Sequence, residues 1–134
     1  MNYKKIPENN NRTKGDIGED LAVEYLIRKG YEIIERNHSN PFGEIDVIGR
    51  NSGNLCFIEV KSRADDEAGS PWEAVTRYKQ SKIIRAALGY IMQNKVAGQQ
   101  VRFDVVAVYP KTGQVELLKN AFEKSSAGRW VPPF

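Results

Sequence analysis

The hydrophobic and polar positions along the chain predict helices that alternate with short strands. Apolar residues recur at helical spacing over residues 16–29, and again over a stretch that begins at 72 or 76 and ends at 94. Continuous or alternating apolar runs predict strands at 31–36, 44–49, 55–61 and 102–109, with a short strand at 114–118 that pairs with the last or lies near it. The order α-β-β-β-α-β therefore predicts an α/β fold, a mixed β-sheet flanked by helices.

The same pattern divides the chain into three segments. Residues 1–13 are polar and rich in asparagine, which predicts a flexible lead-in. Residues 14–121 carry the periodic pattern and are expected to form one domain, followed by a C-terminal tail at 122–134. Turn-forming residues at 37–43 predict a turn after the first strand, and a glycine- and acid-rich loop at 63–71 precedes the second helix.

Composition excludes several kinds of chemistry. The 134 residues include one cysteine, Cys56, and one histidine, His38, so the chain has no intrachain disulfide, thiolate cluster or paired-histidine zinc motif. No apolar run is long enough to cross a bilayer or to act as a secretory signal, and we expect a cytoplasmic protein without a membrane partner. Any chemistry must therefore come from carboxylates and lysine.

Two neighbouring strands carry such groups. Because side chains on a strand alternate between faces, Glu44 and Asp46 share one face of the first strand, and Glu59 and Lys61 share one face of the second. The two strands are close enough in sequence to form a β-hairpin. Whether the four side chains meet depends on the register of that hairpin.

A particular loop length would bring the groups together. If residues 51–54 form a four-residue loop, Arg50 pairs with Leu55, and Asp46 then stands opposite Glu59. The other acid of the first strand stands opposite the lysine in the same register. A shift of one residue would send the two sets to opposite faces of the sheet.

Opposed carboxylates on an apolar hairpin need a cation. Mg²⁺ or Mn²⁺ prefers oxygen ligands and keeps several waters, one of which is a nucleophile for a phosphodiester. Lys61 can orient that water, help to deprotonate it, or neutralise charge in the transition state. Glu19 lies at the border of the first helix's apolar stripe, from which it could reach toward the hairpin.

A basic segment follows these strands. No acidic residue occurs from residue 74 to residue 103, although the net charge of the whole chain is only +3. This segment predicts a surface that binds a nucleic-acid backbone, whereas the alternative interpretation is an ordinary solvated helix face. The candidate phosphate-binding residues are Arg77, Lys79, Lys82 and Arg85.

The ordered motifs resemble those of the bacterial UPF0102 (YraN-type) family. That family is similar to archaeal Holliday-junction resolvases and, more widely, to PD-(D/E)XK endonucleases. The resemblance runs from about residue 14 to residue 121. The motifs that carry it are Gly15-Asp-Ile-Gly-Glu19, Gly30-Tyr31, Arg36-Asn37, Gly43-Glu-Ile-Asp46, Phe57-Ile-Glu-Val-Lys-Ser-Arg63 and Arg102-Phe-Asp-Val-Val106.

The resemblance implies a restriction-endonuclease-like sheet, a requirement for Mg²⁺ or Mn²⁺, and a capacity to form a homodimer. It implies Glu19, Asp46 and Glu59 as metal ligands, and Asp46, Glu59 and Lys61 as the catalytic set. The proline that usually precedes the first catalytic aspartate is absent, because Ile45 occupies its place.

Three functions are consistent with these features. The first is a metal-dependent DNA endonuclease that hydrolyses phosphodiester bonds, with branched or junction DNA as a candidate substrate and DNA favoured over RNA. The second is a nucleic-acid-binding module of the same fold with little or no cleavage. The third is an interaction protein, which predicts Glu59 and Lys61 well solvated and far from Asp46. Glu44 is a secondary site candidate, and Asp104 is read as a charge at a strand end.

Overall fold

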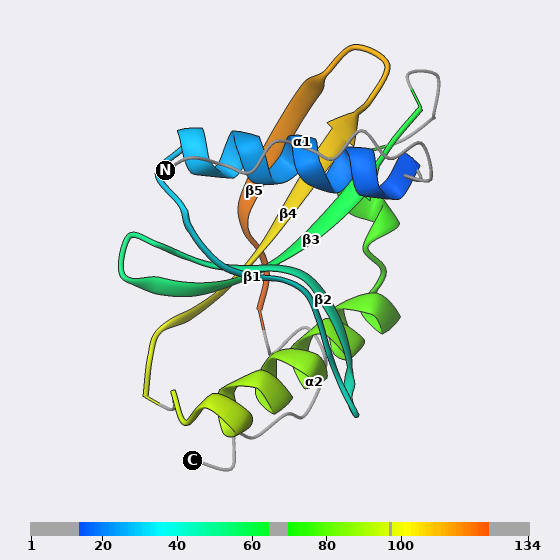
Figure 1. Cartoon of the computed structure of the whole chain (residues 1–134). Helices are drawn as coiled ribbons and strands as arrows, with labels where there is room; N and C mark the ends of the chain where they lie inside the picture. The colour runs from blue at the N-terminus through cyan, green and yellow to red at the C-terminus, as the bar shows by residue number, and fades with distance from the viewer. Residues whose placement is uncertain (1–13, 65–69, 97, 124–134) are drawn as a thin grey trace.

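A computed structural model describes residues 14–64, 70–96 and 98–123 and shows one sheet with a helix on each face (Figure 1). The predicted lead-in at 1–13 and the tail from residue 124 onward lie outside the described residues. The elements are α1 (Lys14–Arg28), β1 (Glu32–Asn40), β2 (Gly43–Asn51), β3 (Asn54–Ser62), a 3₁₀ turn η1 (Pro71–Ala74), α2 (Arg77–Asn94), β4 (Val101–Tyr109) and β5 (Gln114–Phe122).

The five strands form one mixed sheet in the order β1-β2-β3-β4-β5. The pairs β1–β2, β2–β3 and β4–β5 are antiparallel, whereas β3 and β4 are parallel. A parallel pair needs a crossover connection, and α2 supplies it between β3 and β4. The predicted α/β fold with a mixed sheet flanked by helices is confirmed, as is the pairing of the last strand with β4.

Each helix buries its apolar stripe against one face of the sheet. α1 packs through Ala22, Val23 and Leu26 on a cluster of β2, β3 and β4 side chains. α2 packs through a second cluster on the other face, which includes Phe57 and Phe103 from neighbouring parallel strands. No helix within the described ranges has the length and apolarity required to span a membrane.

The ends of β1 and β5 differ from the sequence prediction, and the start of α2 settles which of two predicted starts is correct. The predicted turn at 37–43 is wrong for its first part, because β1 continues to Asn40 and the turn occupies residues 41–42. β1 is an edge strand, whose polar side chains can face solvent, so the turn-forming residue types at 37–40 do not end the strand. β5 extends to Phe122, which is buried in the core one residue beyond the predicted domain boundary. α2 begins after Thr76, whose hydroxyl accepts a hydrogen bond from the N–H of Lys79 at 3.3 Å.

Asp104 is a buried residue and not the strand-end charge expected from the sequence. Its side chain has no exposed surface and accepts two hydrogen bonds from Arg102, at 2.8 and 2.9 Å. The hydroxyl of Tyr31 and the backbone N–H of Asn120 also donate to it, at 2.8 and 2.9 Å. This network ties β4 to β5 and to the start of β1, so the charge is structural.

The hairpin register agrees with the predicted one. Arg50 pairs with Leu55, and the pairing continues inward to Val47 and Ile58. The turn itself is tighter than the four-residue loop, because Asn51 also pairs with Asn54. Residues 52–53 both have positive φ, 51° and 79°, as a two-residue type I′ turn requires.

Candidate functional site

The candidate site begins where β2 and β3 separate. Their ladder ends at the Val47–Ile58 pair, and the next residue toward the site on each strand is Asp46 and Glu59. Ile45 and Val47 are two residues apart, yet they pack in the core clusters on opposite faces of the sheet. The strict alternation assumed from the sequence therefore breaks at Asp46.

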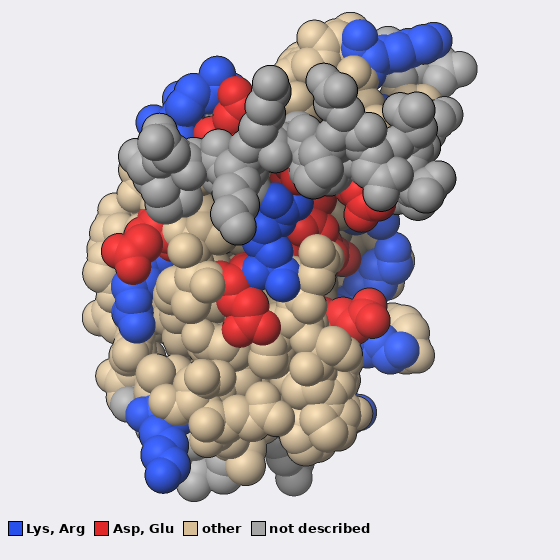
Figure 2. All heavy atoms as spheres, in the orientation of Figure 1, with Lys and Arg blue, Asp and Glu red and all other residues tan. Residues whose placement is uncertain are grey.

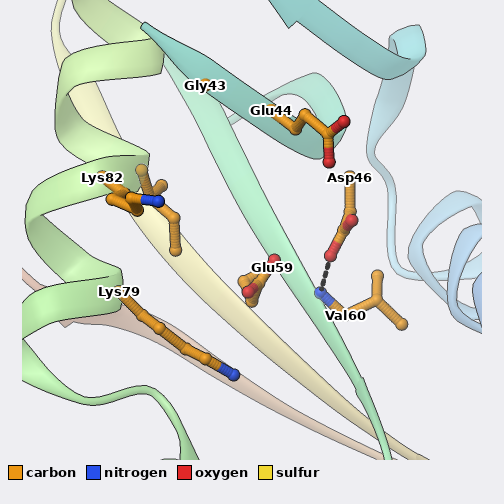
Figure 3. Close-up of a pocket in the computed structure, with 8 residues that line it drawn as sticks. Gly43, Glu44, Asp46, Glu59, Val60, Lys79 and Lys82 are labelled. Atoms are coloured by element: carbon orange, nitrogen blue, oxygen red, sulfur yellow. Dashed lines mark hydrogen bonds between the residues drawn. The ribbon is translucent and has the colours of Figure 1, made fainter.

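Asp46 bridges the gap between the strands. Its Oδ2 atom accepts a hydrogen bond from the backbone N–H of Val60 at 2.8 Å, drawn as a dashed line in Figure 3. The carboxylate thus takes the place of a ladder partner for β3. This bond fixes the direction of the Asp46 side chain and satisfies an N–H that the diverging strands would leave unpaired.

Glu59 lies beside Asp46. Burial, a hydrogen bond to the Asp46 side chain and the charge of Asp46 raise the pKa of Glu59 well above its ordinary value, and Lys61 and Lys79 oppose that rise only in part. Two carboxylates in contact cannot both ionise cheaply, which is why the charge of Asp46 adds to the rise in the pKa of Glu59. The two acids that the sequence placed opposite each other therefore meet, which the interaction-protein hypothesis did not predict.

A second lysine joins Lys61 at this site. The pKa of Lys61 is lowered, first by the side chain of Lys79 and then by burial, while Glu59 and Asp46 act in the opposite direction. Figure 3 shows the side chain of Lys79 reaching from α2 toward the strand that carries Glu59. The sequence indicated Lys79 only as a backbone-binding residue, because no local pattern places the first turn of α2 beside β3.

Glu19 is near this pair but has another partner. It is buried on α1, and its Oε1 atom accepts a hydrogen bond from Nε of Arg36 at 2.9 Å. Burial raises the pKa of Glu19, the Arg36 side chain lowers it, and the charges of Asp46 and Asp20 add smaller increases. The predicted ligand Glu19 is thus close enough for the charge of Asp46 to raise its pKa. Its carboxylate is hydrogen-bonded to Arg36.

An open cleft of about 510 Å³ lies beside the carboxylate pair. Of the four predicted phosphate-binding residues, Lys79 and Lys82 line it and the other two do not. The secondary candidate Glu44 is exposed and lines it as well. The lining residues are Gly43, Glu44, Asp46, Glu59, Val60, Lys79, Lys82 and Ile83 (Figure 3).

The wider surface carries both signs of charge. Figure 2 shows basic and acidic side chains interspersed across one face of the molecule. The mild net charge of +3 agrees with this distribution. A polyanion would therefore be attracted by local groups such as Lys79 and Lys82, because the surface as a whole is not uniformly positive.

The donor set at the strand divergence fits a hard divalent cation. Within the described ranges, no three His, Cys, Asp or Glu side chains are grouped to hold a metal ion. Mg²⁺, however, is commonly held by one or two carboxylates and keeps several waters. Asp46 and Glu59 supply two such carboxylates, and a cation held by both would offset their mutual repulsion. Arg36 engages one carboxylate oxygen of Glu19, Oε1.

Comparison with known proteins places these residues in a family context. A family model described as "Uncharacterised protein family UPF0102" matches residues 18–108. A UPF0102 protein of Desulfosudis oleivorans is 43% identical over 119 residues, covering 89% of this chain and 97% of the relative. A UPF0102 protein of Acetivibrio thermocellus is 44% identical over 130 residues, covering 91% and 100%. A UPF0102 protein of Clostridioides difficile is 42% identical over 113 residues, covering 84% and 99%.

Proposed function

The chain belongs to the UPF0102 family, and we propose that it is a metal-dependent endonuclease that hydrolyses phosphodiester bonds in DNA. The observation that carries this proposal is the contact between Asp46 and Glu59 at the divergence of β2 and β3. Such a pair is unfavourable in a stable protein unless it has a ligand to hold. A divalent cation beside two lysines is a combination suited to a phosphodiester.

The proposed roles follow from the side chains. Asp46 and Glu59 would hold Mg²⁺ or Mn²⁺, which when bound supplies an acidified water and neutralises phosphate charge. Lys61 is close enough to interact with Lys79, Glu59 and Asp46, and its ammonium group would donate hydrogen bonds to the attacking water or to a phosphate oxygen. Lys79 would share that task, since its side chain lies against that of Lys61.

The proposed substrate is DNA, reached through the basic side of the cleft. Lys79 and Lys82 line the cleft on its α2 side, and no acidic residue occurs between residues 74 and 103 to oppose them. Branched or junction DNA is the substrate that the family resemblance favours. Because a junction is resolved by two cuts, a homodimer is part of this proposal, and its test is the oligomeric state in solution.

The second candidate function is a nucleic-acid-binding module with little or no cleavage. The specific observation in its favour is the ion pair between Arg36 and Oε1 of Glu19, which engages one oxygen of the third expected ligand. A site that holds its ion through two carboxylates alone would bind it weakly. The two candidates differ in cleavage and agree in DNA binding.

Cleavage by the purified protein distinguishes them. Branched, duplex and single-stranded DNA are each incubated with Mg²⁺, with Mn²⁺ and with a chelator. We expect cutting only with a divalent ion, and we expect Asp46→Asn and Glu59→Gln to abolish it with little change in volume or fold. Glu116→Gln, on β5 and outside the cleft, is the matched control. If Asp46→Asn cuts as fast as the parent, Asp46 is not a metal ligand.

A further inference from the structure

Two aromatic rings stand out on the surface of the described residues. Phe42 is 55% exposed and Tyr78 is 69% exposed, while the other described aromatic side chains are buried or partly buried. Each of the two directly neighbours a residue that lines the cleft, since Gly43 follows Phe42 and Lys79 follows Tyr78. Neither ring lines the cleft itself. A single exposed ring is ordinary on a protein surface, but two that each adjoin a cleft-lining residue point to a ligand.

The turn that carries Phe42 is fixed against α2. It is fixed by two hydrogen bonds, from Asn40 Nδ2 to the carbonyl of Ala86 at 2.9 Å and from Phe42 N–H to Asn40 Oδ1 at 2.8 Å. Gly89 makes room for this contact, because a Cβ there would lie 2.8 Å from Asn40 Nδ2 and 2.9 Å from Phe42 Cδ2. A glycine inside a helix is roughly 1 kcal/mol less favourable than alanine, and here the missing side chain leaves room for Asn40 and Phe42.

Tyr78 lies on the same face of α2 as the contact with Phe42. Residues 78, 82 and 89 fall on one side of a helix at 100° per residue. Lys82 lies between them, lines the cleft, and holds its Nζ 5.1 Å from the centre of the Tyr78 ring. Tyr78 and Gly89 are about 16 Å apart along the helix axis. The two rings therefore flank a cleft lysine on a helix face that contains no acid.

We propose that Phe42 and Tyr78 stack on unpaired nucleobases, so that the substrate class of the proposed nuclease is nucleic acid with unpaired nucleotides beside the scissile phosphate. An aromatic ring can contact the face of a base only where that base is not stacked within a duplex. Lys82, between the rings, would neutralise the phosphate of the same strand. This inference rests on the proposed function for its substrate, but the binding that it describes does not depend on cleavage.

The test measures binding in Ca²⁺, which holds back cleavage. Two DNAs of equal length are compared, one fully paired and one with an unpaired stretch that contains a fluorescent base analogue quenched by stacking. We expect the parent to bind the unpaired DNA more tightly and to change the emission of the analogue. Tyr78→Leu and Phe42→Leu are each expected to weaken that binding roughly 5- to 150-fold while leaving duplex binding unchanged.

The control variants separate a loss of base stacking from a change in folding. Phe42→Leu retains an apolar contact with Gly89 and lacks only the aromatic face, whereas Phe42→Trp retains the face and should restore binding. Ile17→Ala removes another exposed apolar side chain, on α1, and should change neither affinity. Equal losses on both DNAs, no loss on either, or a change in oligomeric state with an unaltered preference would each overturn the proposal.

Failure of the two proposals can be distinguished. If the parent cuts no DNA under any divalent ion but prefers unpaired DNA through both rings, the stacking surface stands and the nuclease function is wrong. If the parent cuts and the leucine variants cut and bind as the parent does, the nuclease function stands and the stacking surface is wrong. Glu116→Gln, which lies outside the cleft and leaves both rings in place, should keep the binding preference in either case.

Discussion

Asp46 accepts a hydrogen bond from the backbone N–H of Val60 at 2.8 Å, across the point where β2 and β3 part. Val60 lies between Glu59 and Lys61, so this one bond fixes the stretch of backbone on which both side chains stand. The carboxylate of one strand therefore positions the Glu-x-Lys segment of the other. Such support from neighbouring groups is what a metal or phosphate site needs to hold its geometry.

Replacing Glu59 by glutamine is expected to stabilise the protein when divalent ions are chelated. Burial and the contact with Asp46 raise the pKa of Glu59, so above the ordinary carboxyl pKa the folded state holds a proton that the unfolded state has released. The stability of the parent must then fall as the pH rises through that range. Glu59→Gln has no carboxyl group to ionise and should not lose stability in this way. Thermal unfolding of both proteins in chelator, at mildly acidic and mildly alkaline pH, measures how much stability each loses.

Adding Mg²⁺ or Mn²⁺ supplies the control for that experiment. The parent should gain stability, because an ion that binds only the folded state shifts the equilibrium toward it. Glu59→Gln should gain little, whereas Glu116→Gln should behave as the parent does. If Glu59→Gln gains as much stability from the ion as the parent does, Glu59 is not a metal ligand.

Lys61→Ala is expected to lower the rate of cleavage far more than the affinity for DNA. Loss of one preorganised donor to a developing charge typically slows catalysis roughly 100- to 1,000-fold. Single-turnover rates give the first quantity, and binding in Ca²⁺ gives the second. Lys111→Ala, in the turn between β4 and β5, is the matched control. If the whole effect of Lys61→Ala appears in affinity, the ammonium acts only as a phosphate anchor.

The hairpin at the centre of the site could be predicted because local rules determine it. A two-residue turn at residues 52–53 sets the register, and that register brings Asp46 and Glu59 to the same end of the β2–β3 ladder, although side-chain alternation itself breaks at Asp46. The same local patterns located both helices and the order of the strands. These features depend on residues close together in sequence, where propensity and periodicity carry information.

The rest of the site depends on tertiary packing that no local pattern contains. Lys79 meets Lys61 because α2 packs against the sheet, and Glu19 meets Arg36 because α1 contacts β1. Asp104 was misread for the same reason. Its partner Arg102 is two residues away, but its burial comes from neighbouring strands and from Tyr31, 73 residues distant.

Asp104→Ala is expected to destabilise the fold without touching the cleft. Removing the carboxylate leaves the Arg102 guanidinium, whose side chain is 13% exposed, without its charge partner, and among the described residues only its hydrogen bonds to Tyr31 and Asn51 remain. Breaking a buried ion pair in this way costs roughly 3–5 kcal/mol in the free energy of unfolding. Denaturant titration measures the loss, and Glu116→Ala on the neighbouring strand should cost far less. Near-equal losses for the two variants would mean that the Asp104 network contributes no more than a surface charge.

Neutralising Lys79 and Lys82 together is expected to flatten the salt dependence of DNA binding. Both line the cleft, so a DNA backbone that reaches the carboxylate pair passes them. Each cation that neutralises a duplex phosphate contributes about 0.9 to the slope of log affinity against log salt, so the double change to glutamine should reduce that slope by about 1.8.

A matched pair separates this effect from a change in net charge. Lys29→Gln with Lys111→Gln removes the same two charges from positions that do not line the cleft. Titrations of salt in Ca²⁺ should give that control the slope of the parent, and the cleft variant should lose affinity about equally across sequences. Identical slopes for the cleft variant and the parent would mean that Lys79 and Lys82 belong to a solvated helix face and contact no phosphate.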